Sequence, residues 1–578
     1  FVRRARRQQE RTVELAPRRG AIVDRDGRPL AVTATVESVF AIPSDIDDPA
    51  AVARALAPVV GLPVAELKRK LSDRERDFVW VARRVSEETA RAVRDGAIPG
   101  VRLLKESARR YPEGALAAPV VGYVGTDSQG LAGLEYSWDA EVRGRPARVT
   151  VLRDAAQRSY AIRRGTPAGG GRRTTDEVEG ASLQLTLHAG LQHLAEAELQ
   201  KVCEEYRARS ASAIVMDPAT GEVLAMATWP SFDPNRWNEA SAEARRCRPI
   251  SDAYEPGSTF KVITAAAAID AGTLGPDDVV NCGGGSLTIG RTTIHEHGRA
   301  AWAALPLIDV LAHSSNVGAA YIGLGLGKAG FHRAVRAFGF GGKTGIDLEG
   351  ETPGLLRDPA SWSALSLPTM SFGQEIGVNA LQLTRAFCAI ASGGLLPTPH
   401  LVSAISRPGT GPERKAPPAP TRVISEETSA AMRRLLVKVV EAGTGKKAAV
   451  PGFTVAGKTG TAQKAVPGAG YSNDRYVSSF FGFLPAERPR AVIGVVVDEP
   501  RGKTYGGDVA APVFSVLAAE AMRLMNEPGR PQDDRVLPSI LTADLSRGAG
   551  PVAGELPPGL LPASNRAPEP AEDPALLP

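Results

Sequence analysis

Short segments of alternating or helically spaced hydrophobic residues fill the first third of the chain. Residues 19–31 predict two strands joined by a tight turn at an Asp-Gly pair. The spacing of apolar residues predicts helices at 51–56, 64–71 and 87–95. Residues 165–173 are rich in glycine and arginine and have no periodicity, so they predict a loop or linker.

The hydrophobic pattern changes at Ser182. Leucines alternate with other residues over 183–187, which predicts a strand. A helix with one apolar side is predicted at 192–206, and strands follow at 211–216 and 223–227. The sequence DPATG between these two strands is typical of a hairpin turn.

Three further apolar strands are predicted late in the chain, at 453–456, 476–484 and 491–497, and each is bounded by turn residues. We expect the early and late strands to form one antiparallel sheet. A largely helical lobe, at about 258–445, would then be inserted between them. This order of elements predicts an α+β (mixed α/β) fold.

Length and composition predict more than one domain. A chain of 578 residues exceeds one ordinary core. Its apolar content of 43% suits globular domains rather than a protein with many membrane spans. Eleven prolines among the last 53 residues predict a disordered tail, because that segment buries too little apolar surface to fold. We therefore divide the chain into residues 1–180, 181–525 and 526–578.

The formal net charge of +5 is spread along the chain, which argues against a nucleic-acid partner and permits a mild attraction to anionic surfaces. No apolar run approaches the ~20 residues that cross a bilayer. The chain starts at Phe1, without Met, and continues directly into an arginine-rich stretch. We interpret Phe1 and Val2 as the end of a removed membrane helix, and an arbitrary starting point is the alternative.

The cysteines and histidines do not predict a metal site. Four cysteines are widely separated and include no Cys-x-x-Cys pair, so a zinc ribbon or thioredoxin-type site is not expected and no disulfide is required. The His-Glu-His sequence at 295–297 lacks the His-Glu-x-x-His spacing of a zinc site, so we expect surface histidines there. The cysteines are Cys203, Cys247, Cys282 and Cys388.

Three short motifs carry the chemical signal, and the first is STFK, from Ser258 to Lys261, at the start of a predicted helix. Free backbone N–H groups and the helix dipole favour developing negative charge at such a position. Lys261 lies one turn along the same face, and a lysine whose pKa is lowered by burial and nearby cations can accept the serine proton. Ser258 is therefore the candidate nucleophile and Lys261 the candidate general base. The motif alone also fits an N-cap followed by a surface lysine.

The second motif is SSN, residues 314–316, which follows an apolar helical stretch. Ser314 can relay a proton between Lys261 and a leaving amine. Asn316 can bind a peptide oxygen of a substrate. Taken alone, the motif is better explained as an N-cap for a helix at 317–326.

The third motif is KTGT, Lys458 to Thr461, which follows a predicted strand. Gly460 permits a close approach of backbone to backbone at a sheet edge. Lys458 can hold a substrate carboxylate with help from the hydroxyls of Thr459 and Thr461. The backbone N–H groups of Thr461 and Ser258 can form an oxyanion hole.

Two nearby features are interpreted as structural. A second Lys-Thr-Gly, Lys343 to Gly345, follows a glycine-rich turn rather than a strand. His313 adjoins the SSN motif and suggests a Ser-His hydrolase. However, no Gly-x-Ser-x-Gly sequence surrounds Ser258, so we do not assign His313 to the chemistry.

A P-loop ATPase is the rival interpretation, because residues Gly452 to Thr459 also fit the pattern Gly-x4-Gly-Lys-Thr. A P-loop lysine stands at the start of a helix that binds phosphate. Here Pro467 and the glycines around it prevent a helix of useful length. The residues between the two glycines of the pattern are also strand formers, so we favour the acyl-transfer site.

In this order, the three motifs resemble those of class B penicillin-binding proteins, the membrane-anchored cell-wall transpeptidases. The sequence EPGSTFK at 255–261 resembles the family's nucleophile helix. The sequence DPATGEVLAM at 217–226 resembles the strand pair that opens its catalytic domain. The three motifs start 56 and 144 residues apart, which fits the family's spacing.

The front of the chain resembles the same family. Residues 19–31 are similar to its membrane-proximal signature Arg-Gly-x-Ile-x-Asp-Arg-x-Gly. Residues 110–112, 121–125 and 133–135 resemble the pedestal of the septal, FtsI-type members. The resemblance covers residues 11–525. It implies a penicillin-binding, serine β-lactamase-like transpeptidase domain with an antiparallel five-stranded sheet flanked by helices, preceded by an elongated, non-catalytic pedestal of the dimerisation type.

The resemblance further implies a peptidoglycan D,D-transpeptidase that acts on stem peptides ending in D-Ala-D-Ala. It would form an acyl-enzyme at Ser258, need no metal or organic cofactor, and be inhibited by β-lactams. A single N-terminal helix would anchor it in the bacterial inner membrane, with the catalytic domain on the periplasmic side at the division septum. Its implied partners are a membrane-embedded glycosyltransferase and other division proteins, and no nucleic acid.

The same site would also serve a D,D-carboxypeptidase, a β-lactamase or a β-lactam sensor. A β-lactamase does not need a front domain of about 180 residues, and no signalling segment is visible. A scaffold with a vestigial site is an alternative of another class, and the presence of every motif residue argues against it.

Overall fold

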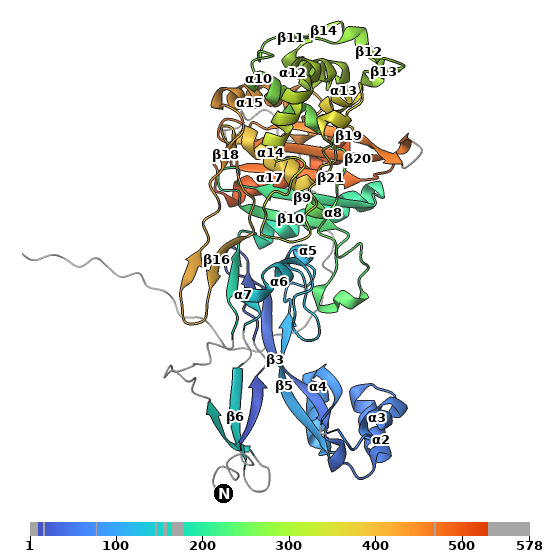
Figure 1. The fold of residues 1–578 in the computed structure, drawn as a ribbon, viewed down its shortest axis with the longest axis vertical. Coiled ribbons are helices and arrows are strands. Elements are labelled where there is room, and N and C mark those ends of the chain that lie inside the picture. Colours follow the sequence, from blue (N-terminus) through green and yellow to red (C-terminus); the bar gives the residue numbers. More distant parts are fainter. Residues whose placement is uncertain are drawn as a thin grey trace, which may run out of the picture. The chain divides into compact units, whose positions relative to one another are not determined.

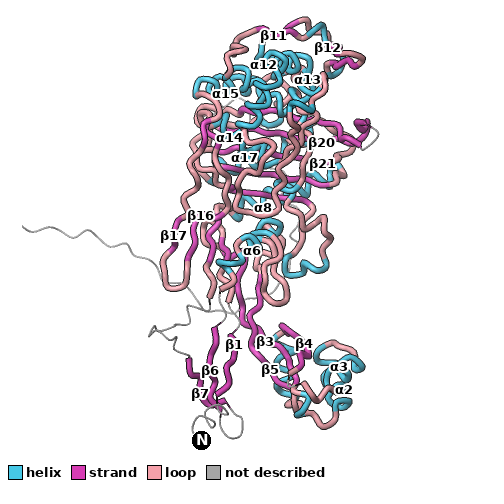
Figure 2. Tube along the Cα trace, in the orientation of Figure 1, coloured by secondary structure: helices cyan, strands magenta, loops and turns pink. Residues whose placement is uncertain are grey.

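The structure is a computed structural model that describes residues 10–15, 18–76, 78–144, 147–153, 159–164, 179–466 and 470–529 (Figures 1 and 2). These residues belong to one compact unit, residues 1–530. The predicted linker and nearly all of the predicted tail lie outside the described residues. Within the described part, every helix is too short or too polar to cross a bilayer.

A five-stranded antiparallel sheet forms the centre of the main domain, in the order β10-β9-β21-β20-β19. This arrangement confirms the predicted pairing of early with late strands. The order also places β19, which carries the KTGT motif, at an edge of the sheet. The strands are β9 (Ser210–Met216), β10 (Val223–Trp229), β19 (Ala456–Val466), β20 (Gly470–Leu484) and β21 (Ala491–Asp498).

β19 begins later than predicted. The sequence predicts a strand at 453–456, but the strand starts at Ala456 and continues through the KTGT motif. Gly452 has a φ of +81°, which ordinary side chains avoid, and a backbone bridge between Val450 and Phe453 closes a turn there. The KTGT motif therefore lies inside a strand rather than after one.

Helices cover both faces of this sheet, and the strand side chains alternate between them with a period of two. Val215 and Val495 pack with α8 and α17, whereas Ile214 and Val496 pack with residues of α14. The prediction of a helix at 192–206 is confirmed as α8. The three helices are α8 (Ala189–Tyr206), α14 (Ala380–Ala391) and α17 (Ala511–Leu524).

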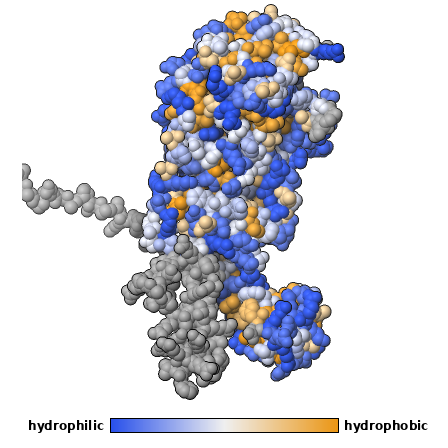
Figure 3. Space-filling view, viewed as in Figure 1, coloured by the Kyte–Doolittle hydropathy of each residue, from blue (hydrophilic) through white to orange (hydrophobic). Residues whose placement is uncertain are grey.

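The predicted helical lobe lies between β10 and β19 in the sequence (Figure 1). Three small strand pairs inside it, β11–β14, β12–β13 and β15–β18, were not predicted. Figure 3 shows hydrophobic residues at the end of the lobe where Figure 1 labels β11 and β14. The helices are α9 (Arg248–Ser251), α10 (Lys261–Asp270), α11 (Leu307–Ala312), α12 (Asn316–Ala337), α13 (Ser366–Ser371) and α15 (Glu426–Glu441). The strands are β11 (Val279–Asn281), β12 (Ser286–Ile289), β13 (Thr292–His295), β14 (Ala304–Pro306), β15 (Leu395–Leu396) and β18 (Thr421–Arg422).

A second sheet takes strands from both sides of residue 180, in the order β17-β16-β8-β2-β3-β4, with β5 also paired to β3. The strand predicted at 183–187 is β8, so its expected place in the central sheet is wrong. β8 instead pairs in parallel with β2 and antiparallel with β16. The strands are β2 (Ile22–Val23), β3 (Pro29–Ala41), β4 (Val79–Val85), β5 (Val101–Arg110), β8 (Ser182–Leu185), β16 (Val402–Ser406) and β17 (Pro412–Arg414).

The front third contains the predicted hairpin and helices. β2 and β3 are antiparallel, and the Asp24 carboxylate accepts hydrogen bonds from the backbone of Asp26 and Arg28 in the turn between them. β3 is much longer than predicted. The three predicted helices are α2 (Pro49–Val60), α3 (Val64–Leu71) and α4 (Glu87–Gly96). The remaining elements are β1 (Glu10–Leu15), α5 (Ala118–Val121), α6 (Gly133–Ser137), α7 (Asp139–Val142), β6 (Ala147–Arg153) and β7 (Ser159–Arg164).

A buried ion cluster joins three separate segments of this region. The Arg19 side chain donates to the Glu135 carboxylate at 2.8 Å, and Arg109 donates to the other oxygen of the same carboxylate at 2.6 Å. Arg109 also donates to the carbonyl of Gly20 at 2.7 Å. All three charged side chains are buried, so each depends on the others for charge compensation.

We expect Glu135→Gln to lower the free energy of unfolding by about 3–5 kcal/mol, because Arg109 loses its carboxylate and Arg19 keeps only Asp139. Urea denaturation followed by tryptophan fluorescence measures this change. Glu66→Gln removes an equivalent charge from an exposed pair with Lys70 and serves as the control. Equal denaturation midpoints for both variants and the wild type would contradict the expected role of the cluster.

Candidate active site

Ser258 lies on a 3-10 turn, Gly257–Phe260, and α10 begins at Lys261. Ser258 therefore precedes the helix by one turn rather than starting it. Gly257 has a φ of +55°, and its N–H donates to the carbonyl of Gly373 at 3.0 Å. Phe260 is fully buried and its ring packs against Phe340 with centroids 5.2 Å apart. Packing of Phe260 in the core thus fixes the turn, while Ser258 itself is only half-buried.

The SSN motif forms the tight turn between α11 and α12. Ser314 is a non-glycine residue with a φ of +62°, so its backbone is in the left-handed region. Ser315 is the N-cap of α12, and its hydroxyl accepts from the N–H of Gly318 at 2.8 Å. The predicted N-cap is confirmed at Ser315, which leaves the side chains of Ser314 and Asn316 available for the chemical roles predicted for them.

The KTGT strand approaches the Ser258 turn closely, and Gly460 makes this possible. A Cβ atom at Gly460 would lie 2.4 Å from the Ser479 hydroxyl, 2.9 Å from a methyl group of Thr259 and 3.1 Å from the carbonyl of Pro256. Such distances are shorter than van der Waals contact. Any side chain at this position would push β19 away from the turn, as the motif analysis anticipates.

Side chains from all three motifs converge around Lys261. Its Nζ donates to the Ser314 carbonyl at 2.5 Å, to the Ser314 hydroxyl at 3.2 Å and to the Asn316 side-chain oxygen at 2.7 Å. The Nζ of Lys458 donates to the same Ser314 hydroxyl at 3.0 Å. One serine hydroxyl therefore links two lysines that are 197 residues apart. Ser258 has no direct hydrogen bond to Lys261 among the described contacts.

Both lysines are buried, with exposed fractions of 1% for Lys261 and 0% for Lys458. Burial disfavours the charged form, and it lowers the pKa of Lys458 to about 7. The pKa of Lys261 is held well below its ordinary value by burial first and by the charge of Lys458 second. The Lys458 amine can therefore give and accept protons near neutral pH, and the lowered pKa of Lys261 makes its neutral, basic form easier to reach than in water.

The Thr459 hydroxyl of KTGT accepts a hydrogen bond from the Nζ of Lys458 at 3.5 Å. The Thr459 hydroxyl pairs with that of Thr444 at 2.7 Å. The Thr461 hydroxyl accepts from the N–H of Gly506, the first residue of α16 (Gly506–Val509), at 3.0 Å. Both hydroxyls are therefore held by neighbouring segments that the sequence analysis did not identify.

Glu296 was also missed as a site residue. The sequence analysis considered residues 295–297 only as surface histidines that do not form a zinc site, and it gave the glutamate between them no role. Glu296 is instead buried against the first turn of α12, whereas the neighbouring histidines are exposed as expected. Its only sequence signal is a carboxylate between two histidines, which does not identify a role.

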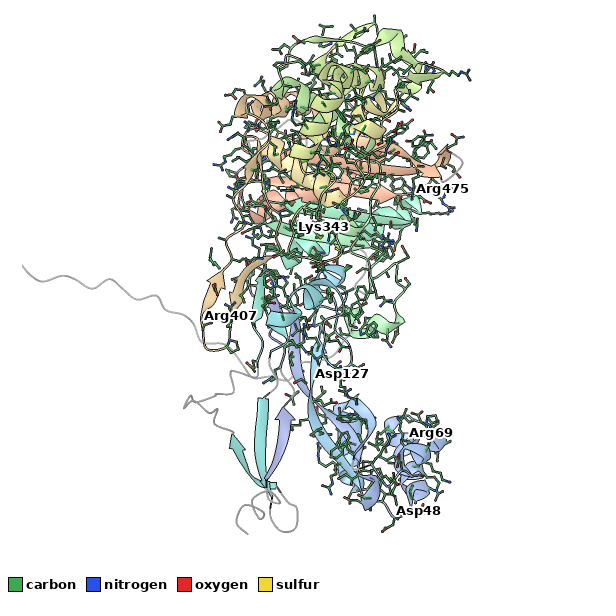
Figure 4. All side chains as sticks on the ribbon, viewed as in Figure 1. Asp48, Arg69, Asp127, Lys343, Arg407 and Arg475 are labelled. Carbon is green, nitrogen blue, oxygen red and sulfur yellow. The ribbon has the colours of Figure 1, made fainter. Side chains whose placement is uncertain are left out.

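The features judged structural remain outside this array. Lys343 is exposed, and the N–H of Thr344 donates to the buried Glu351 carboxylate at 2.9 Å (Figure 4). His313 is exposed and its ring stacks on Trp302. β19 continues as a strand after the Gly-Lys-Thr sequence, so the P-loop interpretation lacks its required helix. All four cysteines are free.

A cavity of about 520 Å³ adjoins the Ser258 turn. Tyr254, Glu255, Ala462 and Lys464 are among its lining residues. The Tyr254 hydroxyl and one oxygen of the Glu255 carboxylate are buried there without a hydrogen-bond partner in the described structure. The lining of the cavity includes residues that precede the STFK motif and follow the KTGT motif, whereas Ser258, Lys261 and Lys458 are not among its lining residues.

Comparison with known proteins relates the chain to one family. The family model "Penicillin binding protein transpeptidase domain" matches residues 211–519, and the model "Penicillin-binding Protein dimerisation domain" matches residues 14–173. The probable peptidoglycan D,D-transpeptidase PenA of Neisseria gonorrhoeae is 34% identical over 89% of this chain and 86% of its own. The peptidoglycan D,D-transpeptidase FtsI of Escherichia coli is 34% identical over 89% of this chain and 85% of its own. The crystal structure of penicillin-binding protein 3 of Mycobacterium tuberculosis with aztreonam has a TM-score of 0.70 and 29% identity, covering 90% of this chain and 98% of that one.

We expect the Lys458 amine to titrate with a midpoint near pH 7, whereas a lysine in water titrates at about 10.4. NMR of protein labelled with 15N-lysine measures this midpoint, and the loss of the resonance in Lys458→Gln assigns it. The unfolded chain holds this proton up to a higher pH than the folded protein does. The free energy of unfolding should therefore rise with pH between the midpoint of the folded protein and that of a lysine in water. A midpoint close to the value in water would contradict the burial argument.

Proposed function

This chain belongs to the penicillin-binding protein transpeptidase family, and from that premise we propose that Ser258 is the nucleophile with which it cross-links peptidoglycan stem peptides. The protein is a serine-type peptidoglycan D,D-transpeptidase. The hydrogen-bonded array of Lys261, Ser314, Asn316 and Lys458 beside Ser258 is the observation that supports this assignment of residues.

Acylation begins when the Ser258 hydroxyl attacks the carbonyl carbon of the penultimate D-Ala. Lys261 accepts the hydroxyl proton, and the depressed pKa of its amine supports this role. A neutral amine donates two hydrogens and keeps one lone pair for the Ser258 proton. The oxygen of the tetrahedral intermediate becomes negative, and the backbone N–H groups of Ser258 and Thr461 stabilise it.

Collapse of the intermediate breaks the C–N bond to the terminal D-Ala. The leaving nitrogen needs a proton, which Ser314 passes on from the two lysines that share its hydroxyl. D-Ala departs and an ester remains on Ser258. An amine from a neighbouring stem then attacks this ester, gives its proton to Lys261 and releases Ser258. The chemistry uses neither a metal nor an organic cofactor.

Lys458, with Thr459, Gly460 and Thr461, forms the subsite for the terminal carboxylate. The charge of Lys458 and the hydroxyls of the two threonines suit a carboxylate. The fixed contacts of those hydroxyls with Thr444 and Gly506 keep them in place. The cavity beside Ala462 provides room for the remainder of the stem peptide.

We further infer that the protein acts at the division septum on the periplasmic side of the inner membrane, held by an N-terminal anchor. FtsI of Escherichia coli and stage V sporulation protein D of Bacillus subtilis, both relatives, support this inference. Its expected partners are a membrane-embedded glycosyltransferase and other division proteins. Imaging of a tagged full-length protein in dividing cells tests this localisation.

We expect a labelled penicillin to modify Ser258 covalently, because β-lactams mimic the D-Ala-D-Ala terminus. Ser258→Ala should abolish labelling, and Lys261→Gln should slow it about 10²- to 10⁴-fold through loss of the base. Gel fluorescence and peptide mass spectrometry measure both effects, with the exposed Ser241→Ala as control. Equal labelling of wild type and Ser258→Ala would contradict the assignment.

A D,D-carboxypeptidase would use the same residues with water as the acceptor. Incubation with a donor stem pentapeptide and an amine acceptor separates the two outcomes. Mass spectrometry should detect the cross-linked product together with released D-Ala. Release of D-Ala without cross-linked product would favour the carboxypeptidase.

A further inference from the structure

Glu296 is a buried carboxylate beside the site that the mechanism above does not use. It lies between β13 and the 3-10 turn His297–Arg299, and only 4% of its surface is exposed. A buried carboxylate is costly unless hydrogen bonds or opposite charges compensate for the lost water. Its partners therefore indicate which part of the structure it serves.

Those partners are the free N–H groups at the start of α12. One carboxylate oxygen of Glu296 accepts from the N–H of Asn316 at 2.8 Å, and the other accepts from the N–H of Val317 at 3.2 Å. The Ser315 hydroxyl also donates to Glu296 and accepts from the N–H of Gly318. Glu296 thus satisfies the first N–H groups of the helix, directly or through Ser315, where the helix dipole also favours a negative charge.

The same short segment orients the Asn316 side chain. The Asn316 amide nitrogen donates to the carbonyl of His295 at 3.3 Å, which leaves its oxygen to accept from Lys261 at 2.7 Å. Ser314 has a left-handed backbone that surrounding contacts must maintain. Residues 295 and 296 therefore hold the SSN turn in the orientation that presents three acceptors to Lys261.

Glu296 also acts on Lys261 through its charge. The positive charge of Lys458 lowers the pKa of the Lys261 amine, and the negative charge of Glu296 raises it. Cys282, which contacts the Ser315 hydroxyl at 3.6 Å, is a thiol whose pKa burial raises, so it adds no charge near neutral pH. The imidazoles of His295 and His297 are exposed on the same segment, and His297 bonds to the Tyr505 hydroxyl.

We propose that Glu296 is a positioning residue of the transpeptidase site, whose carboxylate holds Ser314 and Asn316 against Lys261 and whose charge counters that of Lys458. It contacts no reacting atom and works through the first turn of α12. The inference rests on the proposed function, since it concerns the residue assigned there as the general base.

The decisive variant is Glu296→Gln, which keeps the size of the side chain but removes its charge. A displaced SSN turn should slow acylation by a labelled penicillin about a hundredfold at the pH optimum. Loss of the negative charge should lower the pKa of Lys261 further. The rising limb of the pH–rate profile should therefore move to lower pH, because the neutral base forms earlier.

Two further variants separate charge from structure. Glu296→Asp keeps the charge but withdraws the carboxylate by one methylene, so acylation should slow while the rising limb stays at the wild-type pH. Glu427→Gln removes an exposed carboxylate elsewhere and should change neither quantity. All variants retain His295 and His297, so any contribution of these two side chains is the same in every profile.

If acylation of Glu296→Gln is slower but the rising limb of its pH–rate profile does not move, the electrostatic part of the proposal is overturned. Glu296 would then act only as a cap of α12. Wild-type rates in both Glu296 variants would overturn it entirely. If Glu296→Gln does not fold, Glu296→Asp is the deciding variant. A wild-type acylation rate in Glu296→Asp contradicts a positioning role. A slower rate with the rising limb at the wild-type pH supports that role. Absence of labelling in the wild type would instead reject the proposed function, so the two failures are distinguishable.

Discussion

The burial of two lysine amines around one serine hydroxyl is the constraint on which this site depends. Removing an ammonium group from water costs several kcal/mol, and placing a second one nearby adds repulsion. The protein offsets this cost with acceptors on Ser314 and Asn316 and with the depressed pKa of both amines. Burial destabilises the charged form of both lysines, and the charge of Lys458 adds to this at Lys261. The same effects lower the pKa of their amines and so let them carry protons.

Close backbone packing is what brings these side chains together. Gly460 lets the edge strand touch the turn that carries Ser258, and Gly373 lies against the other side of that turn. The ring of Phe260 locks the turn into the core of the helical lobe. Each contact involves segments far apart in the sequence, so the site exists only once the sheet and the lobe have both formed.

The sequence was sufficient for the features that follow from local pattern. Short apolar runs bounded by turn residues at 211–216 and 491–497 identify strands of the central sheet, and the order of the three motifs identifies the residues of the lysine array. It was insufficient where the outcome depends on partners distant in the chain. The pairing of β8 with β2 has no local signal, because a strand's pattern does not specify its neighbour. The role of Glu296 likewise depends on which helix end lies against it.

The shared sheet around β2 has a consequence for the way this chain can be divided. β8 and β16 lie on either side of Ser258 and Ser314 in the sequence, and together with β17 they complete a sheet whose other strands come from the first 110 residues. Cutting the chain between the two family matches would leave the hydrogen-bonding groups along β8 without their partner from β2. Exposed strand edges of that kind recruit other strands. A catalytic fragment excised at this point would carry an open strand edge on β8, which a second copy of the fragment could pair with.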